Sequence, residues 1–306
     1  FHERSLNADL GLALCLDAQQ ALREDMRVLV MSATMDSDAV SRLLGGAPVL
    51  SGQGRLFDVA TRYRSNIPQM NIEAEVAATI AQALGCDAGS MLVFLPGEAE
   101  IRRTAGLLAK KALPADVAVL PLYGNLSRQD QDRAIDPVPK GSRKVVLTTS
   151  IAETSLTIEG VSIVVDSGLM RLPRFDPRSA MTRLITVPVT RASADQRRGR
   201  AGRTGPGVCY RLWTESQHGQ LQEYTPAEIR SADLASFALE LALWGEIDAA
   251  RLSWLDPPPA GALAQARALL QDLDALDSRY RITEQGRLMA ALPLHLRLGH
   301  MLVQGA

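Results

Sequence analysis

One eight-residue segment, QRRGRAGR, holds four arginines and a glutamine. Guanidinium groups suit a site that stabilises charge on a phosphoryl group in transfer, because they stay charged and donate several hydrogen bonds at once. If Ser193 or Asp195 caps a helix here, the i, i+4, i+7 spacing places three side chains on one face: Gln196, Arg200 and Arg203. An arginine-rich surface helix is the alternative, but it leaves the two glycines of the segment unexplained.

A hydroxyl-rich loop, TTSIAETSLTIEG at residues 148–160, follows the apolar run KVVLT. Sheets of parallel strands place their ligands at the carboxyl ends of the strands. Hydroxyls and backbone amides at such a position suit a phosphate, a ribose or a nucleic-acid backbone. Three shorter turns also follow strand-like runs, and for the first of them a plain strand-end cap is the alternative: Ser32-Ala33-Thr34, Phe94-Leu95-Pro96-Gly97 and Tyr123-Gly124-Asn125-Leu126.

Short apolar runs alternate with helical patterns over the first two thirds of the chain. The predicted strands are Arg27–Met31, Met91–Leu95, Val117–Leu120, Lys144–Thr148 and Ser162–Asp166, and the predicted helices are Asp36–Leu44, Asn71–Leu84, Glu98–Ala112 and Arg128–Ile135. Strands that are apolar on both faces and separated by helices predict an α/β domain with a parallel sheet. After Trp213 the pattern becomes helical, with helices predicted at Ser231–Trp244, at Ala262–Leu276 and from Glu284, and one short strand at Tyr280–Thr283.

Composition bounds the class of protein. The chain has 306 residues, 46% of them hydrophobic, which predicts about two domains and excludes a disordered chain. Its three cysteines lie far apart, so neither a zinc cluster nor a disulfide framework is expected. No apolar run is long enough to span a membrane and no signal peptide opens the chain, so we expect a soluble, cytoplasmic protein without a membrane partner.

The net charge of −1 conceals two oppositely charged segments. Residues 171–211 carry ten arginines and two acidic residues, a net charge of +8, whereas residues 214–280 carry eleven acidic residues and four arginines, a net charge of −7. The overall balance argues against a uniformly basic nucleic-acid binder. The basic segment instead indicates a local anion site, with a solvated basic face as the alternative.

The chain resembles the DEAH-box helicases of superfamily 2 in six motifs that occur in the same order: FHERS, SAT, FLPG, LYGNL, TTSIAETSLTIEG and QRRGRAGR. Details such as RLITVPVTRASADQRRGRAGR and LSWLDPPP are similar to the bacterial HrpB-like branch. The resemblance covers essentially the whole chain, and it implies RecA-like lobes followed by a winged helix. The implied boundaries are the end of a first RecA-like lobe at 1–57, a second lobe at 58–213, a winged-helix domain at 214–285 and the start of a helical ratchet domain at 286–306.

The resemblance also implies roles for individual residues. Gln196, Arg200 and Arg203 would face the γ-phosphate, with the arginines as fingers. Thr157 and Glu159 would lie near the ribose, the metal or the attacking water, and Ile135 near the adenine. Gly124, Thr149 and Ser150 would contact the RNA backbone. Ser32 and Thr34 would couple the nucleotide state to RNA binding. Residues 166–188 would form a β-hairpin beside the RNA.

Three positions depart from the family pattern: Ser150 replaces a frequent Asn, Ile135 a frequent aromatic residue, and Arg198 a small residue. The serine weakens a polar contact to the RNA backbone, the isoleucine implies low base selectivity, and the use of the added charge is unknown.

Two family elements are missing from the sequence. It contains no Gly-Lys pair, hence no G-x-x-x-x-G-K-[ST] phosphate loop, and its one adjacent acid pair, Glu24-Asp25, precedes a predicted strand. Together with the first residue, Phe1, this leads us to expect a fragment of a monomeric ATP-dependent RNA helicase. The parent would use ATP and Mg²⁺ on single-stranded or structured RNA, whereas the fragment would bind neither cofactor and be inactive.

The alternatives are a non-catalytic nucleic-acid-binding or regulatory protein that keeps the second lobe, and a DNA translocase.

Overall fold

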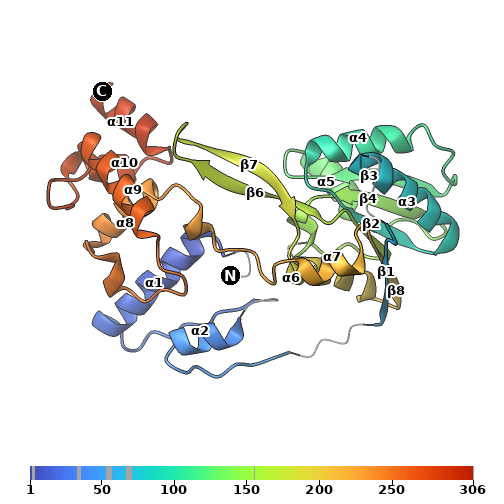
Figure 1. The fold of residues 1–306 in the computed structure, drawn as a ribbon, viewed down its shortest axis with the longest axis horizontal. Helices are drawn as coiled ribbons and strands as arrows, with labels where there is room; N and C mark the ends of the chain where they lie inside the picture. Colours follow the sequence, from blue (N-terminus) through green and yellow to red (C-terminus); the bar gives the residue numbers. More distant parts are fainter. Residues whose placement is uncertain (2–3, 33–35, 53–56, 67–70, 155, 306) are drawn as a thin grey trace. The chain divides into compact units, whose positions relative to one another are not determined.

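The computed structural model describes residues 1, 4–32, 36–52, 57–66, 71–154 and 156–305. It divides into two compact units (Figure 1). The first contains residues 1–50, 173–183 and 226–306, and the second contains residues 51–172 and 184–225. No described helix is long and apolar enough to cross a membrane.

The second unit is built on a six-stranded sheet in the order β1-β8-β5-β2-β4-β3, in which every neighbouring pair is parallel. The predicted α/β class is therefore confirmed. The strands are β1 (Val59–Tyr63), β2 (Ser90–Phe94), β3 (Val117–Leu122), β4 (Arg143–Thr148), β5 (Val161–Asp166) and β8 (Gly207–Arg211). Helices cover the sheet: α3 (Ile72–Cys86), α4 (Glu98–Leu108), α5 (Arg128–Ile135) and α6 (Arg191–Gly199), with α7 (Glu215–Gln220) following β8.

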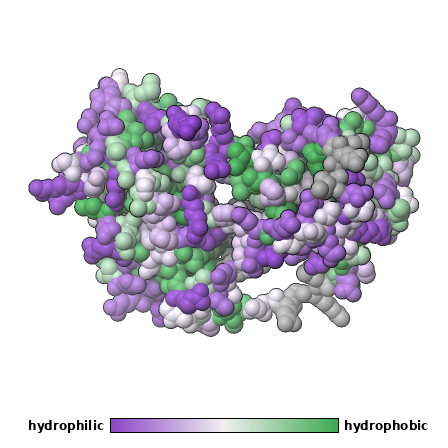
Figure 2. All heavy atoms as spheres, in the orientation of Figure 1, coloured by the Kyte–Doolittle hydropathy of each residue, from purple (hydrophilic) through white to green (hydrophobic). Residues whose placement is uncertain are grey.

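Alternate residues of the buried strands supply separate apolar cores. Met91 and Val93 of β2 pack with α3 and α4, whereas Leu92 and Phe94 pack with residues from α5 and from the 148–160 loop. This two-sided burial is the reason that β2, β4 and β5 read as nearly continuous apolar runs. Polar side chains predominate on the face of the molecule drawn in Figure 2, with apolar side chains scattered among them.

The first unit is helical. Its elements are α1 (Leu6–Ala21), α2 (Ser37–Leu43), α8 (Ala235–Trp244), α9 (Ala260–Asp272), α10 (Glu284–Ala290) and α11 (Leu296–Gly305), with short 3₁₀ turns at Glu228–Arg230 and Ala249–Arg251. Leu10 and Ala13 of α1 belong to the same core as α8, α9 and α10. Arg4 links α1 to the segment before α9, because it pairs with Asp9 at 3.0 Å and with Asp256 at 2.8 Å.

Two predicted strands are wrong. Residues 27–31 form no strand, and Leu29 and Met31 are 79% and 74% exposed. An apolar run becomes a strand only when a neighbour pairs with its backbone, and none of the described residues does so here. The strand predicted at Tyr280–Thr283 is reduced to one antiparallel bridge between Leu276 and Ile282.

The hairpin expected within residues 166–188 is present. Strands β6 (Leu169–Asp176) and β7 (Met181–Pro188) form a separate two-stranded sheet.

The sequence does not predict strands β1 and β8. Each is short and lacks a continuous apolar run, because β1 ends in a tyrosine and β8 in an arginine.

The three cysteines differ in how deeply they are buried. Cys15 and Cys86 are exposed, whereas Cys209 is buried in β8. Burial, followed by the charge of Asp166, raises the pKa of the Cys209 thiol to about 12. We therefore expect two thiols of the native chain to react quickly with Ellman's reagent at pH 8, and the third only after unfolding in guanidinium chloride. Three fast-reacting thiols in the native chain would contradict this burial.

Candidate active site and nucleic-acid interface

The arginine segment begins on a helix and ends on a tighter turn. Thr190, rather than Ser193 or Asp195, caps α6: its hydroxyl accepts a hydrogen bond from the Ser193 amide at 3.2 Å. The helix ends at Gly199, and residues 200–202 form a 3₁₀ turn. The predicted cap is therefore wrong by several residues, and no single helix carries Gln196, Arg200 and Arg203.

Gly202 accounts for one of the two glycines in the segment. A Cβ atom at this position would lie 2.6 Å from the carbonyl oxygen of Phe57 and 2.7 Å from a methyl group of Val59. The Phe57 amide also donates a hydrogen bond to the Gly202 carbonyl at 2.9 Å. The close approach of these two backbones requires glycine and fixes the arginine turn against the start of β1.

Arg197 is the buried arginine of the segment. Its side chain is 1% exposed and pairs with two carboxylates, Glu153 at 2.6 Å and Asp166 at 2.9 Å. It also lies 4.9 Å from the centre of the Phe94 ring. Burial acts to lower the pKa of Arg197, but the charges of Asp166 and Glu153 outweigh it and raise the pKa overall. With its charge compensated twice, Arg197 is suited to structure rather than to binding an anion.

Arg200 and Arg203 have neutral partners instead. Arg200 donates to the carbonyl oxygen of Leu156 at 2.6 Å and to that of Glu153, and Arg203 donates to the Thr157 hydroxyl at 2.9 Å. Within the described part of the chain, no carboxylate lies within ion-pair distance of either guanidinium. Burial, and then the charge of Arg203, lower the pKa of Arg200 to about 10, so Arg200 is still a cation at neutral pH.

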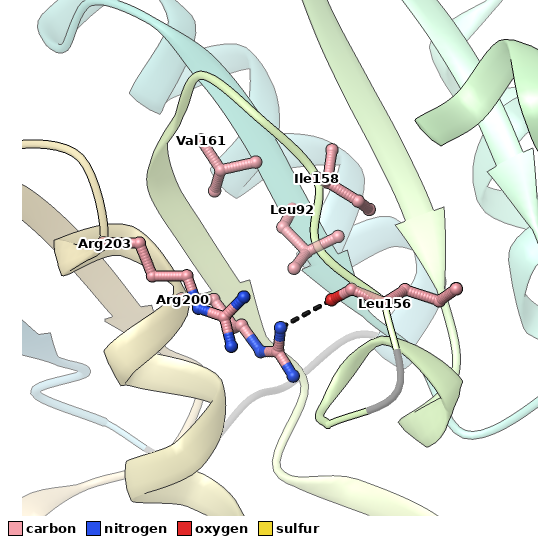
Figure 3. A pocket seen from close by; sticks show the side chains of 6 residues that line it. All are labelled: Leu92, Leu156, Ile158, Val161, Arg200 and Arg203. Atoms are coloured by element: carbon pink, nitrogen blue, oxygen red, sulfur yellow. Dashed lines mark hydrogen bonds between the residues drawn. The ribbon is translucent and has the colours of Figure 1, made fainter. Parts of the chain in front are cut away.

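These two arginines lie over an apolar floor formed by Leu92, Leu156, Ile158 and Val161 (Figure 3). The pocket between them has a volume of only about 10 Å³, roughly the room of one water molecule. A polyphosphate is too large to enter this pocket, and of the two arginines Arg203 is exposed whereas Arg200 is 5% exposed. The apolar floor strengthens the attraction between the guanidinium groups and such an anion, because it lowers the local dielectric constant.

The other nucleotide-binding candidates are placed as follows. Thr157 is in direct contact with Arg203, and Glu159 is exposed two residues further along the same loop. Ile135, the last residue of α5, is half-buried against the core that contains Leu92 and Ile158. Gln196 is half-buried on α6.

The RNA-binding candidates gather at one edge of the sheet. Strands β3 and β4 are parallel neighbours, with Leu122 opposite Thr148. Their carboxyl ends therefore lie side by side, Gly124 following β3, and Thr149 and Ser150 following β4. Gly124 and Ser150 are exposed and Thr149 is half-buried, so backbone amides and hydroxyls are accessible at this edge.

The structure describes one of the two coupling candidates. Ser32 belongs to the first unit, where it is half-buried. Thr34 lies outside the described residues. Of the three departures from the family pattern, Arg198 gains a local explanation, because it lies 3.8 Å from Asp195 one turn earlier on α6.

Sequence reasoning missed the carboxylates that hold the arginine segment. Glu153 accepts from Ser193 and Arg197, and Asp166 accepts from Arg197. One signal was available: Asp166 ends a strand that is otherwise apolar, and an acid in that position needs a cationic partner when it is buried. The partner itself could not be identified among ten nearby arginines without the fold.

Comparisons with known proteins agree with this geometry. Residues 77–205 match the helicase conserved C-terminal domain, and residues 266–294 match the winged helix of the helicase-associated domain HA2. The ATP-dependent RNA helicase HrpB of Escherichia coli (strain K12) is 48% identical over 303 residues, which are 99% of this chain and 37% of that protein. The probable ATP-dependent RNA helicase DHX34 of Homo sapiens is 38% identical over 325 residues, covering 100% of this chain and 28% of that protein.

Solved structures match as well. Two crystal structures of the Escherichia coli HrpB protein, one described as a DExH-box NTPase and the other as a DEAH/RHA helicase, superimpose with TM-scores of 0.90 and 0.92 at 48% and 49% identity. Each match covers 99% of this chain, and 37% and 38% of the solved chains. The chain thus spans a little over a third of the length of HrpB and 28% of that of DHX34. On this evidence the chain is similar over 99% of its length to the HrpB-like DEAH/RHA helicases, and parts of it match their C-terminal and HA2 domains.

Proposed function

We propose that this chain supplies the arginine side of the ATP site, and part of the RNA path, in an ATP-dependent RNA helicase that moves along or unwinds RNA. The observation that carries the proposal is the contrast between two kinds of arginine in one short segment. Arg197 is neutralised by two carboxylates, whereas Arg200 and Arg203 are held by neutral oxygens and pair with no carboxylate of the described residues. Such a pair is suited to the developing charge on a γ-phosphate.

The residues fit one part of the cofactor and not the other. Guanidinium groups fit the phosphates of a nucleotide triphosphate, and the exposed Thr157 hydroxyl and Glu159 carboxylate fit its ribose hydroxyls or an attacking water. Magnesium at a nucleotide site is held by one or two carboxylates together with the phosphates, and the sequence contains neither a phosphate loop nor an Asp-Glu pair. We therefore propose that ATP and Mg²⁺ are held jointly with a phosphate loop and an Asp-Glu pair that this sequence does not contain, and that the 306 residues alone do not hydrolyse ATP.

The proposed division of the chain is the one that the family resemblance implies. Residues 1–57 complete a first RecA-like lobe, 58–213 form the second, 214–285 form the winged-helix domain and 286–306 begin a helical domain. The proposed setting is a monomer in the cytoplasm of a bacterium.

The test uses a polypeptide that joins this chain to a first helicase lobe with a phosphate loop and an Asp-Glu pair. We expect ATP hydrolysis that single-stranded RNA stimulates more strongly than DNA of the same sequence, and none from the 306 residues alone. Stimulation by DNA only would favour a DNA translocase. No hydrolysis in the joined polypeptide, with RNA binding retained, would favour a non-catalytic RNA-binding protein.

RNA binding by the chain itself should be strongly salt-dependent. Ten arginines between residues 171 and 211 place positive charge near the hairpin and the arginine site, and each neutralised phosphate of a single strand contributes about −0.7 to the slope of log K against log salt. For three to five contacts we expect a slope of about −2 to −3.5, measured by fluorescence anisotropy with an oligouridylate.

The three exposed hairpin arginines Arg174, Arg178 and Arg183 allow a matched comparison. Their joint replacement by Gln should reduce the steepness of the slope, whereas Arg251→Gln, an exposed arginine in the acidic segment, should not. A slope near zero for the unmodified chain would contradict the proposed RNA contacts.

A further inference from the structure

Glu153 occupies the turn between the RNA-binding and the nucleotide-binding candidates. It directly follows the 3₁₀ turn Ser150–Ala152, and its amide donates to the Ser150 carbonyl at 2.9 Å. Its side chain is 11% exposed. Neither the family resemblance nor the matched domains give this residue a role.

The carboxylate of Glu153 is fixed by α6 at both oxygens. The Ser193 hydroxyl donates to Oε2 at 2.8 Å, and Arg197 Nε donates to Oε1 at 2.7 Å. Arg197 is in turn held by Asp166 and by the Leu169 carbonyl, so the side chain of Glu153 is anchored to a buried network. A carboxylate held at both oxygens has little rotational freedom.

The backbone of the same residue holds Arg200. The carbonyl oxygens of Glu153 and Leu156 accept hydrogen bonds from the two terminal nitrogens of the guanidinium. The bond to Leu156 is 2.6 Å long (Figure 3). Glu153 thus contacts two arginines in opposite ways. Its carboxylate pairs with Arg197 and lies beyond ion-pair distance of Arg200, where its charge still favours the cationic form of Arg200, whereas its carbonyl oxygen holds Arg200 directly.

We propose that Glu153 is a positioning residue for Arg200: α6 fixes its carboxylate, and the fixed residue then presents its carbonyl oxygen to the guanidinium. This inference rests on the proposed function, because it assumes that Arg200 meets a phosphoryl group. A donor aimed in advance at developing charge accelerates the reaction, whereas a mobile donor must be ordered at the moment of reaction. Anchoring through Glu153 removes that ordering step.

Glu153→Gln separates this role from a simple effect of charge. Loss of a negative charge beside Arg200 should by itself strengthen the binding of ATP and leave turnover unchanged. Loss of positioning should instead lower kcat by about tenfold in the joined polypeptide, with KM for ATP within about twofold of the unmodified value. Glu73→Gln is the matched control, because Glu73 is also buried in this lobe and pairs with Arg103 at 2.6 Å.

A second measurement uses the 306 residues alone. Arg200 is 5% exposed, whereas Arg203 is exposed, so phenylglyoxal should modify Arg203 faster than Arg200 when the peptides are quantified by mass spectrometry. Glu153→Gln should bring the rate at Arg200 close to that at Arg203, and Glu73→Gln should leave both rates unchanged. If Glu153→Gln fails to fold, Ser193→Ala removes one of the carboxylate's donors and should shift both measurements in the same direction by a smaller factor.

Three outcomes decide between the proposals. A lower kcat together with faster modification of Arg200 supports the positioning role. Unchanged kcat, or a lower KM alone, overturns it while leaving the proposed function intact, provided that replacing Arg200 itself abolishes hydrolysis. If the replacement of Arg200 has no effect, the proposed function fails, whatever Glu153→Gln does.

Discussion

Arg200→Ala is expected to reduce ATP turnover of the joined polypeptide by about 10³-fold or more, the range in which arginine fingers act. The guanidinium is oriented by two carbonyl oxygens, retains its charge and lies over an apolar floor. Each of these features increases the stabilisation that it can give to charge developing on a phosphoryl group. The loss should therefore appear in kcat and in kcat/KM alike, because the interaction strengthens in the transition state.

The controls for this variant lie in the same segment. Arg200→Lys keeps the charge but loses the planar fork that meets two carbonyl oxygens, so it should recover only part of the activity. Arg198→Ala should stay close to the unmodified rate, since the Arg198 side chain is 43% exposed and faces Asp195. Steady-state hydrolysis with saturating single-stranded RNA measures all three. Turnover of Arg200→Ala equal to that of the unmodified protein would remove Arg200 from the site.

The parts of the fold that the sequence predicts well are those with a strong local signal. The range predicted for α5, Arg128–Ile135, is the observed one, because Ser127 caps its start and Pro137 follows its end. β2, β4 and β5 are apolar on both faces and were predicted to within one or two residues. The run at 27–31 has the same apolar pattern, but no strand pairs with it in the described part of the chain, so composition alone does not make a strand.

Only part of the site could be predicted from the sequence. Residue types and spacing identified the arginine segment and the hydroxyl-rich loop as candidates, and the structure places them in contact: Arg203 contacts Thr157, and Arg200 contacts the loop's carbonyl oxygens. The sequence could not distinguish Arg197 from Arg200, because the two differ in whether a carboxylate lies beside the guanidinium group. The packing of α6 against β5 determines this.

Arg197→Met should lower the free energy of unfolding of the second unit by about 3–5 kcal/mol, because it leaves the carboxylates of Asp166 and Glu153 without their cation. Asp166 is fully buried and Glu153 nearly so, and water cannot replace the lost guanidinium. Hydrogen exchange of the β5 amides reports this unfolding separately from that of the first unit. Arg191→Met is the control, since its side chain is 44% exposed and 3.7 Å from Glu223, and it should cost less than about 1 kcal/mol.

The double variant Arg197→Met with Asp166→Asn identifies the cause of that loss. If an unpaired buried charge destabilises Arg197→Met, replacing Asp166 by its neutral isostere should restore part of the stability, so the two changes should cost less together than the sum of their separate costs. If the loss arises from packing alone, the costs should add. Additive costs, or an Arg197→Met variant as stable as Arg191→Met, would show that the ion pairs beneath α6 do not hold the arginine segment in place, and the anchoring proposed for Glu153 would lose its support.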